Sequence, residues 1–420
     1  MGSIFVAAHT LGCKVNQCDT DTVLEHLVNI GCTVCNFNDT ADIYIINTCT
    51  VTHASDKKSR QIIRRARKQN PNAIVAVCGC MAQNNPISAN ELGVDFIFDA
   101  RKPNGFIHKV SEMCTGTRNV ALQHAAPRAR TRAFVKIQDG CDRFCAYCIV
   151  PYVRGKPKSR LVQDILAEAE GLIASGIQEI VLTGIQVASY GKDTNTNLSA
   201  LIQQVLSLNG LVRLRLSSIE PCAITSDFLS VIASSQVLCD HFHLSLQSGS
   251  DATLQRMNRH YTTGQYAEIT ESLRKVRPEA ALTTDVIVGF PGETDEEFNQ
   301  SLAFVKKIGF ARIHVFEYSK REGTPAANFP HQVPDKVKSE RSRKMRELAA
   351  ALQLNYHKAQ IGKTAPVLFE TSKAPGKWLG HTNNYCPVEV NCEFNLSNII
   401  KQVKITACTQ DGLEGVIRNN

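Results

Sequence analysis

Apolar residues occur along the chain in short runs that suit buried strands, and these runs alternate with longer segments of helical periodicity. In the N-terminal part, the strand-like runs lie at 4–8, 43–47, 73–78 and 96–98, and the helical segments at 16–29 and 52–69. Short strands that alternate with helices are typical of a parallel sheet with helices on its faces. We therefore predict an N-terminal α/β domain.

The same rhythm continues through the centre of the chain. Six strand-then-helix units are expected there, with strands at 133–138, 179–183, 212–217, 241–246, 283–288 and 312–317. Such units predict an open, partial version of the (β/α)₈ barrel, a fold whose chemistry takes place at the C-terminal ends of its strands.

Beyond residue 331 the pattern changes again. A helix with a basic first half is expected over 335–360, and five short strand-like runs separated by turns follow it. These runs predict a small β-barrel. The predicted fold class is therefore α/β, with an N-terminal parallel α/β domain at 1–125, a partial (β/α)₆ barrel at 126–360 and a C-terminal β-barrel at 361–420.

Sixteen cysteines among 420 residues add candidate chemistry, because many thiols in a long chain without a signal peptide indicate metal or redox function. The N-terminal residues lack the basic start of a signal peptide, and no apolar run reaches the roughly 18 residues of a membrane span. We expect a cytoplasmic protein that does not associate with a membrane.

Lysine and arginine outnumber aspartate and glutamate by 47 to 39, and the resulting net charge of +8 favours an anionic partner such as nucleic acid. Seven of the basic residues lie within the helical segment 56–68. This charge run is either a solvated helix face or a contact with RNA phosphates.

Three cysteines in one short segment, Cys141, Cys145 and Cys148, form the most specific pattern in the chain. Their CxxxCxxC spacing can hold three irons of a 4Fe–4S cluster and leave the fourth iron open to another ligand. The alternative is a zinc site, but structural zinc takes four ligands, usually as paired CxxC units, and the segment offers no fourth cysteine. The pattern therefore indicates a cluster with an open iron.

A second set of cysteines, Cys13, Cys49 and Cys80, follows the first three predicted strands. Functional groups of parallel sheets gather beyond the carboxyl ends of the strands, so these thiols can meet although they are far apart in sequence. Either they form a second metal site, or each is a small buried apolar residue, as free cysteine often is.

The longer segment from Asp139 to Gly155, with Tyr147 just before the last cysteine, resembles the radical S-adenosylmethionine (SAM) enzymes and, among them, the methylthiotransferases. The segments around Cys13, Cys49 and Cys80 are similar to the N-terminal domain of that family, where three cysteines hold an auxiliary 4Fe–4S cluster. The resemblance thus implies two 4Fe–4S clusters and SAM as cofactors. The predicted C-terminal barrel resembles the RNA-binding TRAM domain of these enzymes.

The resemblance also implies a set of SAM contacts, which are Tyr147, Gly184, Ser245, Gln247, Asp285 and Arg259. Most of them lie in glycine-containing or polar turns after predicted strands. The alternative for each turn is that its residues only make a tight strand-to-helix connection.

In the activity implied by the resemblance, one SAM methylates a sulfur at the auxiliary cluster, and a second SAM yields the radical that activates an unreactive carbon. The segments 10–17 and 47–52 are most similar to the branch that modifies N6-threonylcarbamoyladenosine in tRNA, at the purine 3′ of the anticodon. Alternatives are isopentenyladenosine in tRNA, an aspartate of a ribosomal protein and, in a different class, a non-catalytic iron–sulfur RNA-binding protein.

The implied partners are tRNA and an external electron donor such as a flavodoxin or ferredoxin, and we expect a monomer. Arg154, Arg259 and Arg321 lie in loops near predicted strand ends. Their positions are compatible with recognition of the anionic threonylcarbamoyl group.

Overall fold

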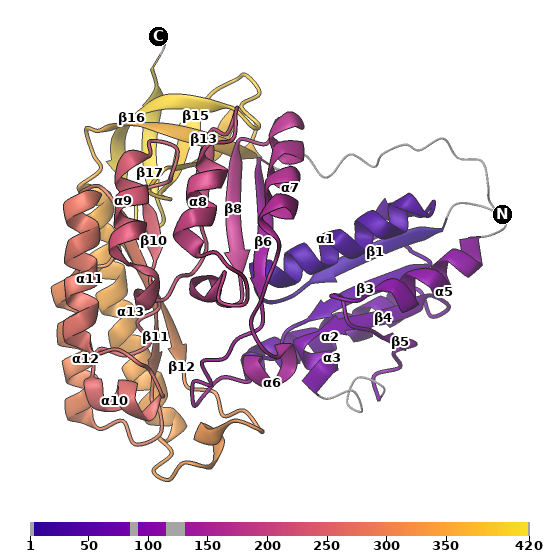
Figure 1. The fold of residues 1–420 in the computed structure, drawn as a ribbon, viewed down its shortest axis with the longest axis horizontal. Helices are drawn as coiled ribbons and strands as arrows, with labels where there is room; N and C mark the ends of the chain where they lie inside the picture. The colour runs from indigo at the N-terminus through magenta and orange to yellow at the C-terminus, as the bar shows by residue number, and fades with distance from the viewer. Residues whose placement is uncertain (1–3, 85–90, 115–130, 419–420) are drawn as a thin grey trace. The chain divides into compact units, whose positions relative to one another are not determined.

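The computed structural model describes residues 4–84, 91–114 and 131–418 (Figure 1). The chain divides into two compact units. The first contains the N-terminal region together with the short segments 140–142 and 148–156, and the second contains the rest of the central and C-terminal regions. The predicted boundary at residue 125 lies outside the described residues, and the other predicted domain limits stay predictions.

A five-stranded parallel sheet forms the centre of the first unit, with strand order β2-β1-β3-β4-β5. Its strands are β1 (Phe5–Thr10), β2 (Thr33–Cys35), β3 (Ile43–Thr48), β4 (Ile74–Gly79) and β5 (Phe96–Ile97). Its helices are α1 (Lys14–Asn29), α2 (His53–Gln69), α3 (Cys80–Asn84), α5 (Asn104–Cys114) and the short α6 (Val150–Arg154). The predicted N-terminal parallel sheet is confirmed, and β2 is a short edge strand that the hydrophobic pattern missed.

Helix α2 has an apolar face and a basic face on opposite sides. Thr52 caps its N-terminus by accepting a hydrogen bond from the Ser55 amide, and Ile62, Ile63 and Ala66 are buried. Six of the seven basic residues are exposed, namely Lys57, Lys58, Arg60, Arg64, Arg65 and Lys68. Arg67 instead donates to the Ala73 carbonyl at 2.8 Å and pairs with Asp95 at 2.6 Å, so its role is to hold the sheet.

Six parallel strands form the partial barrel of the second unit, as predicted. They are β6 (Arg132–Asp139), β8 (Glu179–Gly184), β9 (Arg213–Leu216), β10 (His241–His243), β11 (Ala281–Val288) and β12 (Arg312–Glu317). Isolated bridges from Leu214 to Leu238 and from Ile219 to Leu244 join β9 to β10, so the two sheets continue into each other. A short antiparallel strand, β7 (Lys158–Ser159), lies on the outer edge of β6.

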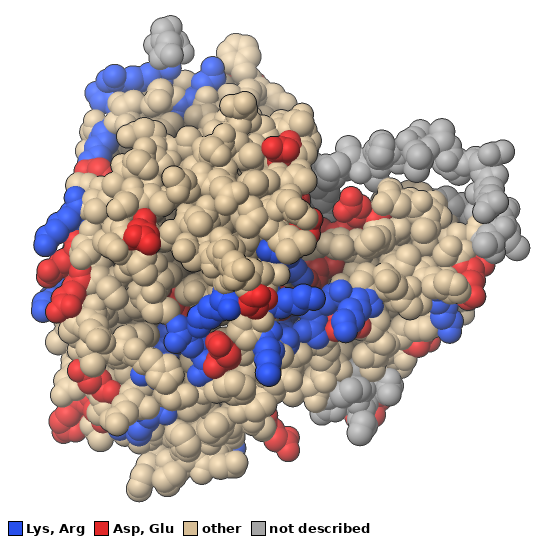
Figure 2. All heavy atoms as spheres, in the orientation of Figure 1, with Lys and Arg blue, Asp and Glu red and all other residues tan. Residues whose placement is uncertain are grey.

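Helices follow the barrel strands and cover their outer side (Figure 1). They are α7 (Val162–Ala174), α8 (Leu198–Leu206), α9 (Ser226–Ser234), α10 (Asp251–Arg256), α11 (Thr263–Val276) and α12 (Asp295–Ile308). Acidic and basic side chains are interspersed over α11 and α12, at the left edge of Figure 2, so the net positive charge is not concentrated there.

The long helix α13 (Asp335–Lys358) packs against β12 and leads into a closed five-stranded barrel. The barrel strands are β13 (Thr364–Ala374), β14 (Lys377–Thr382), β15 (Pro387–Asn391), β16 (Ile400–Cys408) and β17 (Leu413–Ile417). The predicted C-terminal β-barrel is therefore confirmed as a fold. Within the described part of the chain, no helix is both long and apolar enough to cross a bilayer.

A buried charge network fixes the C-terminal barrel to the N-terminal ends of the central strands. The fully buried Glu179 carboxylate accepts two hydrogen bonds from Arg215, at 2.7 and 2.9 Å, and also pairs with Arg132 and Arg213. Arg213 donates to the Pro366 carbonyl of the C-terminal barrel at 2.7 Å. One carboxylate thus orients three guanidinium groups. Arg213 and Arg215 hold the barrel backbone, and Arg132 contacts barrel side chains.

Replacing Glu179 with Gln should destabilise the second unit, because three buried arginines would lose their shared carboxylate. Breaking a buried pair from one side costs roughly 3–5 kcal/mol, and the urea midpoint at neutral pH should fall accordingly. The matched control is Glu168→Gln, whose pair with Arg160 is about one-third exposed and whose loss should cost less than about 1 kcal/mol.

The same network predicts a pH dependence. Burial alone would raise the pKa of Glu179, but Arg215, Arg132 and Arg213 lower it from 4.5 to about 2. The folded-state pKa lies below the unfolded value. The contribution of Glu179 to folding stability is therefore full above about pH 5 and is lost as the pH falls toward about 2. Wild-type stability should fall between about pH 5 and pH 3 more steeply than that of Glu179→Gln; equal slopes would contradict this assignment.

Candidate metal centres

The register of the N-terminal sheet brings Cys13, Cys49 and Cys80 to one edge. Thr10 of β1 pairs with Asn47 of β3, and Asn47 pairs with Cys78 of β4, so three adjacent strands end side by side. Each strand is followed within a few residues by one of the three cysteines. The sequence prediction that these thiols follow neighbouring strand ends is confirmed.

The three thiols differ in exposure but lie close enough to influence one another. Cys13 is exposed, whereas Cys49 and Cys80 are each only 5 % exposed. Burial raises the pKa of Cys49, with a smaller contribution from Cys13, and burial raises the pKa of Cys80 to about 11. Buried thiols of this kind stay protonated at neutral pH until a metal replaces the proton.

The turn that carries Cys13 requires glycine. Gly12 has a φ of +96°, and a Cβ atom at this position would lie 2.9 Å from the Cys49 Cβ and 3.0 Å from its sulfur. A side chain here would be strained in the backbone and would also push Cys49 away. Gly12 therefore allows the first two cysteine turns to approach each other.

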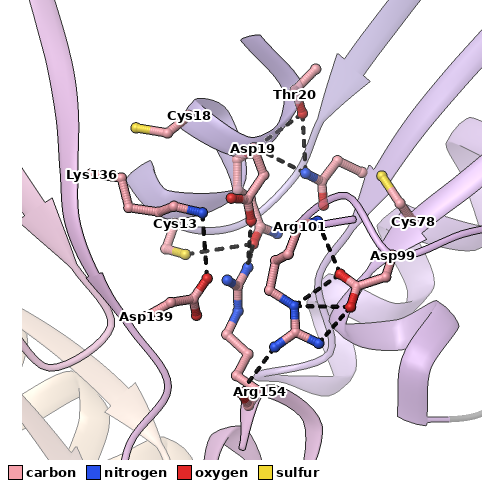
Figure 3. A network of polar contacts seen from close by, with 12 residues as sticks. Cys13, Cys18, Asp19, Thr20, Cys78, Asp99, Arg101, Lys136, Asp139 and Arg154 are labelled. Atoms are coloured by element: carbon pink, nitrogen blue, oxygen red, sulfur yellow. Dashed lines mark hydrogen bonds and ion pairs between the residues drawn. The ribbon is translucent and has the colours of Figure 1, made fainter. Parts of the chain in front are cut away.

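A buried polar network supports these turns (Figure 3). The Asn16 side-chain amide donates to the Leu11 carbonyl at 2.8 Å and to the Thr48 carbonyl at 3.1 Å, which are the backbone groups just before Cys13 and Cys49. The Asn47 amide donates to the Asn16 carbonyl at 2.9 Å. Because these bonds cross from one strand end to the next, they fix the relative positions of the two cysteine turns.

Arg154 adds a buried positive charge to the same network. Its side chain is 3 % exposed, and its Nη2 lies 2.6 Å from the Asn16 Oδ1 and 3.1 Å from the Asp19 Oδ2. Arg154 lowers the pKa of the Cys80 thiol, against the larger effect of burial. Arg154 and Arg321, whose positions are compatible with recognition of an anionic substrate, are both buried.

The spacing of the three thiols tests whether they suit one metal ion. Zn–S bonds of about 2.3 Å would bring three thiolates to about 3.8 Å from one another. Among the residues described, the only three donor atoms of His, Cys, Asp or Glu within 4.8 Å of one another belong to His243, Asp285 and His314. Cys13, Cys49 and Cys80 do not form such a close set among the described residues, and a cluster in which each cysteine binds a different iron does not require one.

The second cysteine set lies in the loop between β6 and α6. Gly140 precedes it with a φ of +75°, and a Cβ there would lie 2.1 Å from the Lys156 carbonyl oxygen. The Cys141 amide donates to the Gly155 carbonyl at 2.9 Å. Only glycine permits this close approach, which holds the start of the loop against its end.

Cys145 lines a pocket of about 290 Å³ in the second unit. Arg259 Nη1 donates to the Cys145 sulfur at 3.3 Å and pairs with Glu220 at 2.8 Å. Glu220 pairs also with Arg143, at 3.2 Å. Sequence reasoning missed Glu220, although it stands just after the third barrel strand, where a polar residue signals a candidate site.

Tyr261 connects Arg259 to Ser245, another of the predicted SAM contacts. Its hydroxyl donates to the carbonyls of Ser245, at 2.8 Å, and Leu246, at 2.6 Å, and it accepts a hydrogen bond from Arg259. Burial raises the pKa of Tyr261 to about 12, so it stays a donor at neutral pH. Gln247, two residues beyond Ser245, has a φ of +68° and pairs through its backbone with β11.

The remaining predicted SAM contacts occupy separate positions. Gly184 is the last residue of β8, and a Cβ atom at this position would lie 3.1 Å from the Gln138 carbonyl oxygen. The Tyr147 ring packs edge to face against Phe290, with 6.4 Å between the ring centroids. Asp285 lies on β11 with its carboxylate 3.3 Å from the His243 Nε2. The structure thus brings Cys145, Arg259 and Ser245 together, whereas Asp285 belongs to a group with His243 and His314.

Comparisons with known proteins agree with this arrangement. Residues 5–99 match the model of uncharacterized protein family UPF0004, and residues 135–305 match that of the radical SAM superfamily. A radical SAM methyltransferase from Kitasatospora setae, solved with tryptophan substrate and a SAM analogue, has a TM-score of 0.59 at 14 % identity, over 83 % of this chain and 89 % of that chain. At this identity the likeness concerns the fold.

Two curated relatives span almost the whole chain. The threonylcarbamoyladenosine tRNA methylthiotransferase of Bacillus subtilis is 39 % identical, over 95 % of this chain and 93 % of the relative. The tRNA-2-methylthio-N(6)-dimethylallyladenosine synthase of Pelotomaculum thermopropionicum is 33 % identical, over 97 % of this chain and 96 % of the relative. On this similarity and coverage, the chain belongs to the radical SAM methylthiotransferase family.

Proposed function

We propose that this protein transfers a methylthio group to the adenine ring of N6-threonylcarbamoyladenosine in tRNA, at the purine 3′ of the anticodon. The observation that carries the proposal is the pair of cysteine triplets, one in the β6–α6 loop and one at the edge of the N-terminal sheet. The printed name of the Bacillus subtilis relative supports this substrate. The second candidate is isopentenyladenosine in tRNA, the type of substrate named for the relative from Pelotomaculum.

The family implies one 4Fe–4S cluster and SAM, and we assign this cluster to Cys141, Cys145 and Cys148. When bound, the cluster supplies the electron that splits SAM into methionine and a deoxyadenosyl radical. The chain's own part is placement. Arg259 donates to the Cys145 sulfur, Glu220 holds Arg259 in position, and Tyr261 fixes the turn that contains Ser245.

We propose the SAM contacts on the same basis. Arg259 and Tyr261 line the Cys145 pocket, and the Tyr261 hydroxyl donates to the Ser245 carbonyl, so polar groups suited to an amino acid moiety lie there. We place Tyr147 and Gly184 at the same strand ends because of their positions in the loop and at the end of β8. Asp285 would act through its pairing with His243.

We further propose that Cys13, Cys49 and Cys80 hold a second, auxiliary 4Fe–4S cluster. The burial of Cys49 and Cys80 and the glycine at position 12, which lets the first two cysteine turns approach each other, suit a group that the three cysteines share. The chain holds the turns of Cys13 and Cys49 with Asn16, and the exposed Cys13 leaves one side of the set accessible.

The proposed partners are tRNA and an electron donor of the flavodoxin or ferredoxin type, acting on a cytoplasmic monomer. Two exposed basic surfaces suit the RNA phosphates. One is the outer face of α2, and the other includes Lys401 and Lys404 on β16, where basic side chains gather in Figure 2. Phosphate contacts release counterions, so such binding should weaken with salt.

The two cysteine sets can be separated by substitution. Anaerobically reconstituted wild type should contain about eight irons. Replacing Cys141, Cys145 and Cys148 with Ala should leave about four irons and abolish SAM cleavage. Replacing Cys13, Cys49 and Cys80 should also leave about four irons, yet spare SAM cleavage and eliminate the methylthio product. Full activity in an iron-free, zinc-loaded protein would reject the assignment.

The basic face of α2 should contribute to tRNA affinity. Reversing the charge of Arg60 and Arg64 should weaken tRNA binding by roughly tenfold at low salt, and the loss should shrink as salt rises. The matched control reverses Lys306 and Lys307 on α12, which lie on a surface of mixed charge and should leave affinity almost unchanged. Equal effects of the two variants in a filter-binding assay would mean that α2 is only a solvated face.

The two candidate nucleosides differ only in the group on the adenine nitrogen, so this group must determine which of them the protein modifies. A pocket that hydrogen-bonds the polar threonylcarbamoyl group would leave its own polar groups unpaired against isopentenyl, so discrimination should reach at least about 100-fold in product formed. The measurement is mass spectrometry of nucleosides after reaction with each tRNA. Preference for isopentenyladenosine would reject the substrate while leaving the reaction class intact.

A further inference from the structure

Helix α6 joins the two cysteine sets through the first unit. It begins directly after Ile149, which follows Cys148, and it packs against α3, whose first residue is Cys80. Its last residue is Arg154, the buried arginine of the auxiliary site (Figure 3). The helix that follows the Cys141–Cys148 loop therefore places the positively charged Arg154 side chain beside the other cysteine set.

The contacts of Arg154 support the first two turns of the auxiliary set, and its helix packs against α3, which begins with the third cysteine, Cys80. The 2.6 Å contact of Arg154 with the Asn16 oxygen orients an amide whose nitrogen donates to the backbone before Cys13 and before Cys49. A planar guanidinium with several fixed donors can make these contacts together, which a single ammonium group cannot.

The backbone around Arg154 also supports the other cysteine set. Arg101 donates to the Arg154 carbonyl at 2.9 Å, and Arg101 is itself paired with Asp99 at 2.8 Å. The next residue, Gly155, accepts the hydrogen bond of the Cys141 amide at 2.9 Å. A displacement of Arg154 would therefore disturb the position of Cys141 as well as that of Cys80.

The negative charge of the cysteine set explains why the residue at position 154 is an arginine. Three thiolates in a partly buried site accumulate negative charge, and the 3 % exposed Arg154 places a positive charge against them. Asp19 pairs with the same guanidinium and holds its orientation. The reduction potential of an iron–sulfur cluster depends on nearby charge and on hydrogen bonds to its sulfurs, and Arg154 can supply both.

We infer that Arg154 is a positioning residue that holds the ligands of the auxiliary cluster, sets its reduction potential and links it to the loop of the SAM-cleaving cluster. The inference rests on the proposed auxiliary cluster at Cys13, Cys49 and Cys80. Arg154 contacts the amide that supports the cysteine turns, and no contact with substrate is required of it.

The decisive variant is Arg154→Gln combined with Asp19→Asn. Arg154→Gln alone would leave Asp19 buried without its cation and could unfold the unit, whereas the double variant removes both charges and keeps polar groups in place. Arg154→Lys is the conservative variant, because it keeps the charge but loses the fork of donors. Arg277→Gln with Asp240→Asn is the matched control, since it removes a 3.0 Å ion pair in the second unit.

The main readout is the midpoint potential of each cluster in the anaerobically reconstituted full chain, followed by EPR. In Arg154→Gln/Asp19→Asn the auxiliary potential should be more negative than in Asp19→Asn alone, because only the double variant lacks the positive charge that stabilises the reduced cluster. Arg154→Lys in the Asp19→Asn background should show much less of that shift. The loop cluster should keep its potential, and the control variant should change neither potential.

A second readout is the ratio of methylthio product to deoxyadenosine. It should fall on the order of tenfold in the double variant, as for other residues that orient metal ligands. Loss of the auxiliary cluster from a folded double variant would also support the positioning role. An unchanged auxiliary potential and EPR spectrum would overturn it. If wild type itself held only about four irons, the two-cluster proposal would fail instead, and the inference with it.

Discussion

The parallel register of β1, β3 and β4 is the constraint on which the first cysteine site depends. Adjacent parallel strands end at the same edge of the sheet, so residues that follow the strands become neighbours although they are far apart in sequence. Here Thr10, Asn47 and Cys78 lie in one row across the sheet. A shift of one residue in this register would move one cysteine turn away from the other two.

Holding three turns at one edge creates buried backbone groups that need partners. Asn16 satisfies two of these carbonyls, and Asn47 holds the Asn16 backbone. Because an incomplete buried polar network is costly, its members depend on one another. Arg154 and Asp19 complete the same network with opposite charges. The arrangement of the three turns is therefore specified by these polar side chains as much as by the cysteines.

The hydrophobic pattern was enough to predict the layers of the fold, because buried strands and amphipathic helices have different periods. It missed β2, which has only three residues and lies at a sheet edge. The cysteines could be found from spacing and strand ends. The pair of Arg154 and Asp19 could not, since 135 residues separate the partners and nothing local marks an arginine as buried. The ion pair of Glu220 with Arg259 could not be predicted from the sequence for the same reason.

These pairings change what the positive charge of the chain means for substrate choice. An arginine already paired with a buried carboxylate could bind a substrate anion only by giving up that partner, and an unpaired buried carboxylate is costly. Arg154 is paired with Asp19, and Arg259 with Glu220. Neither is therefore a ready receptor for the threonylcarbamoyl carboxylate. The exposed lysines and arginines of α2 and β16 suit the phosphates that every tRNA shares. Net charge thus favours tRNA as a partner, whereas the choice of nucleoside must depend on uncharged hydrogen-bonding groups or on cations outside these buried pairs.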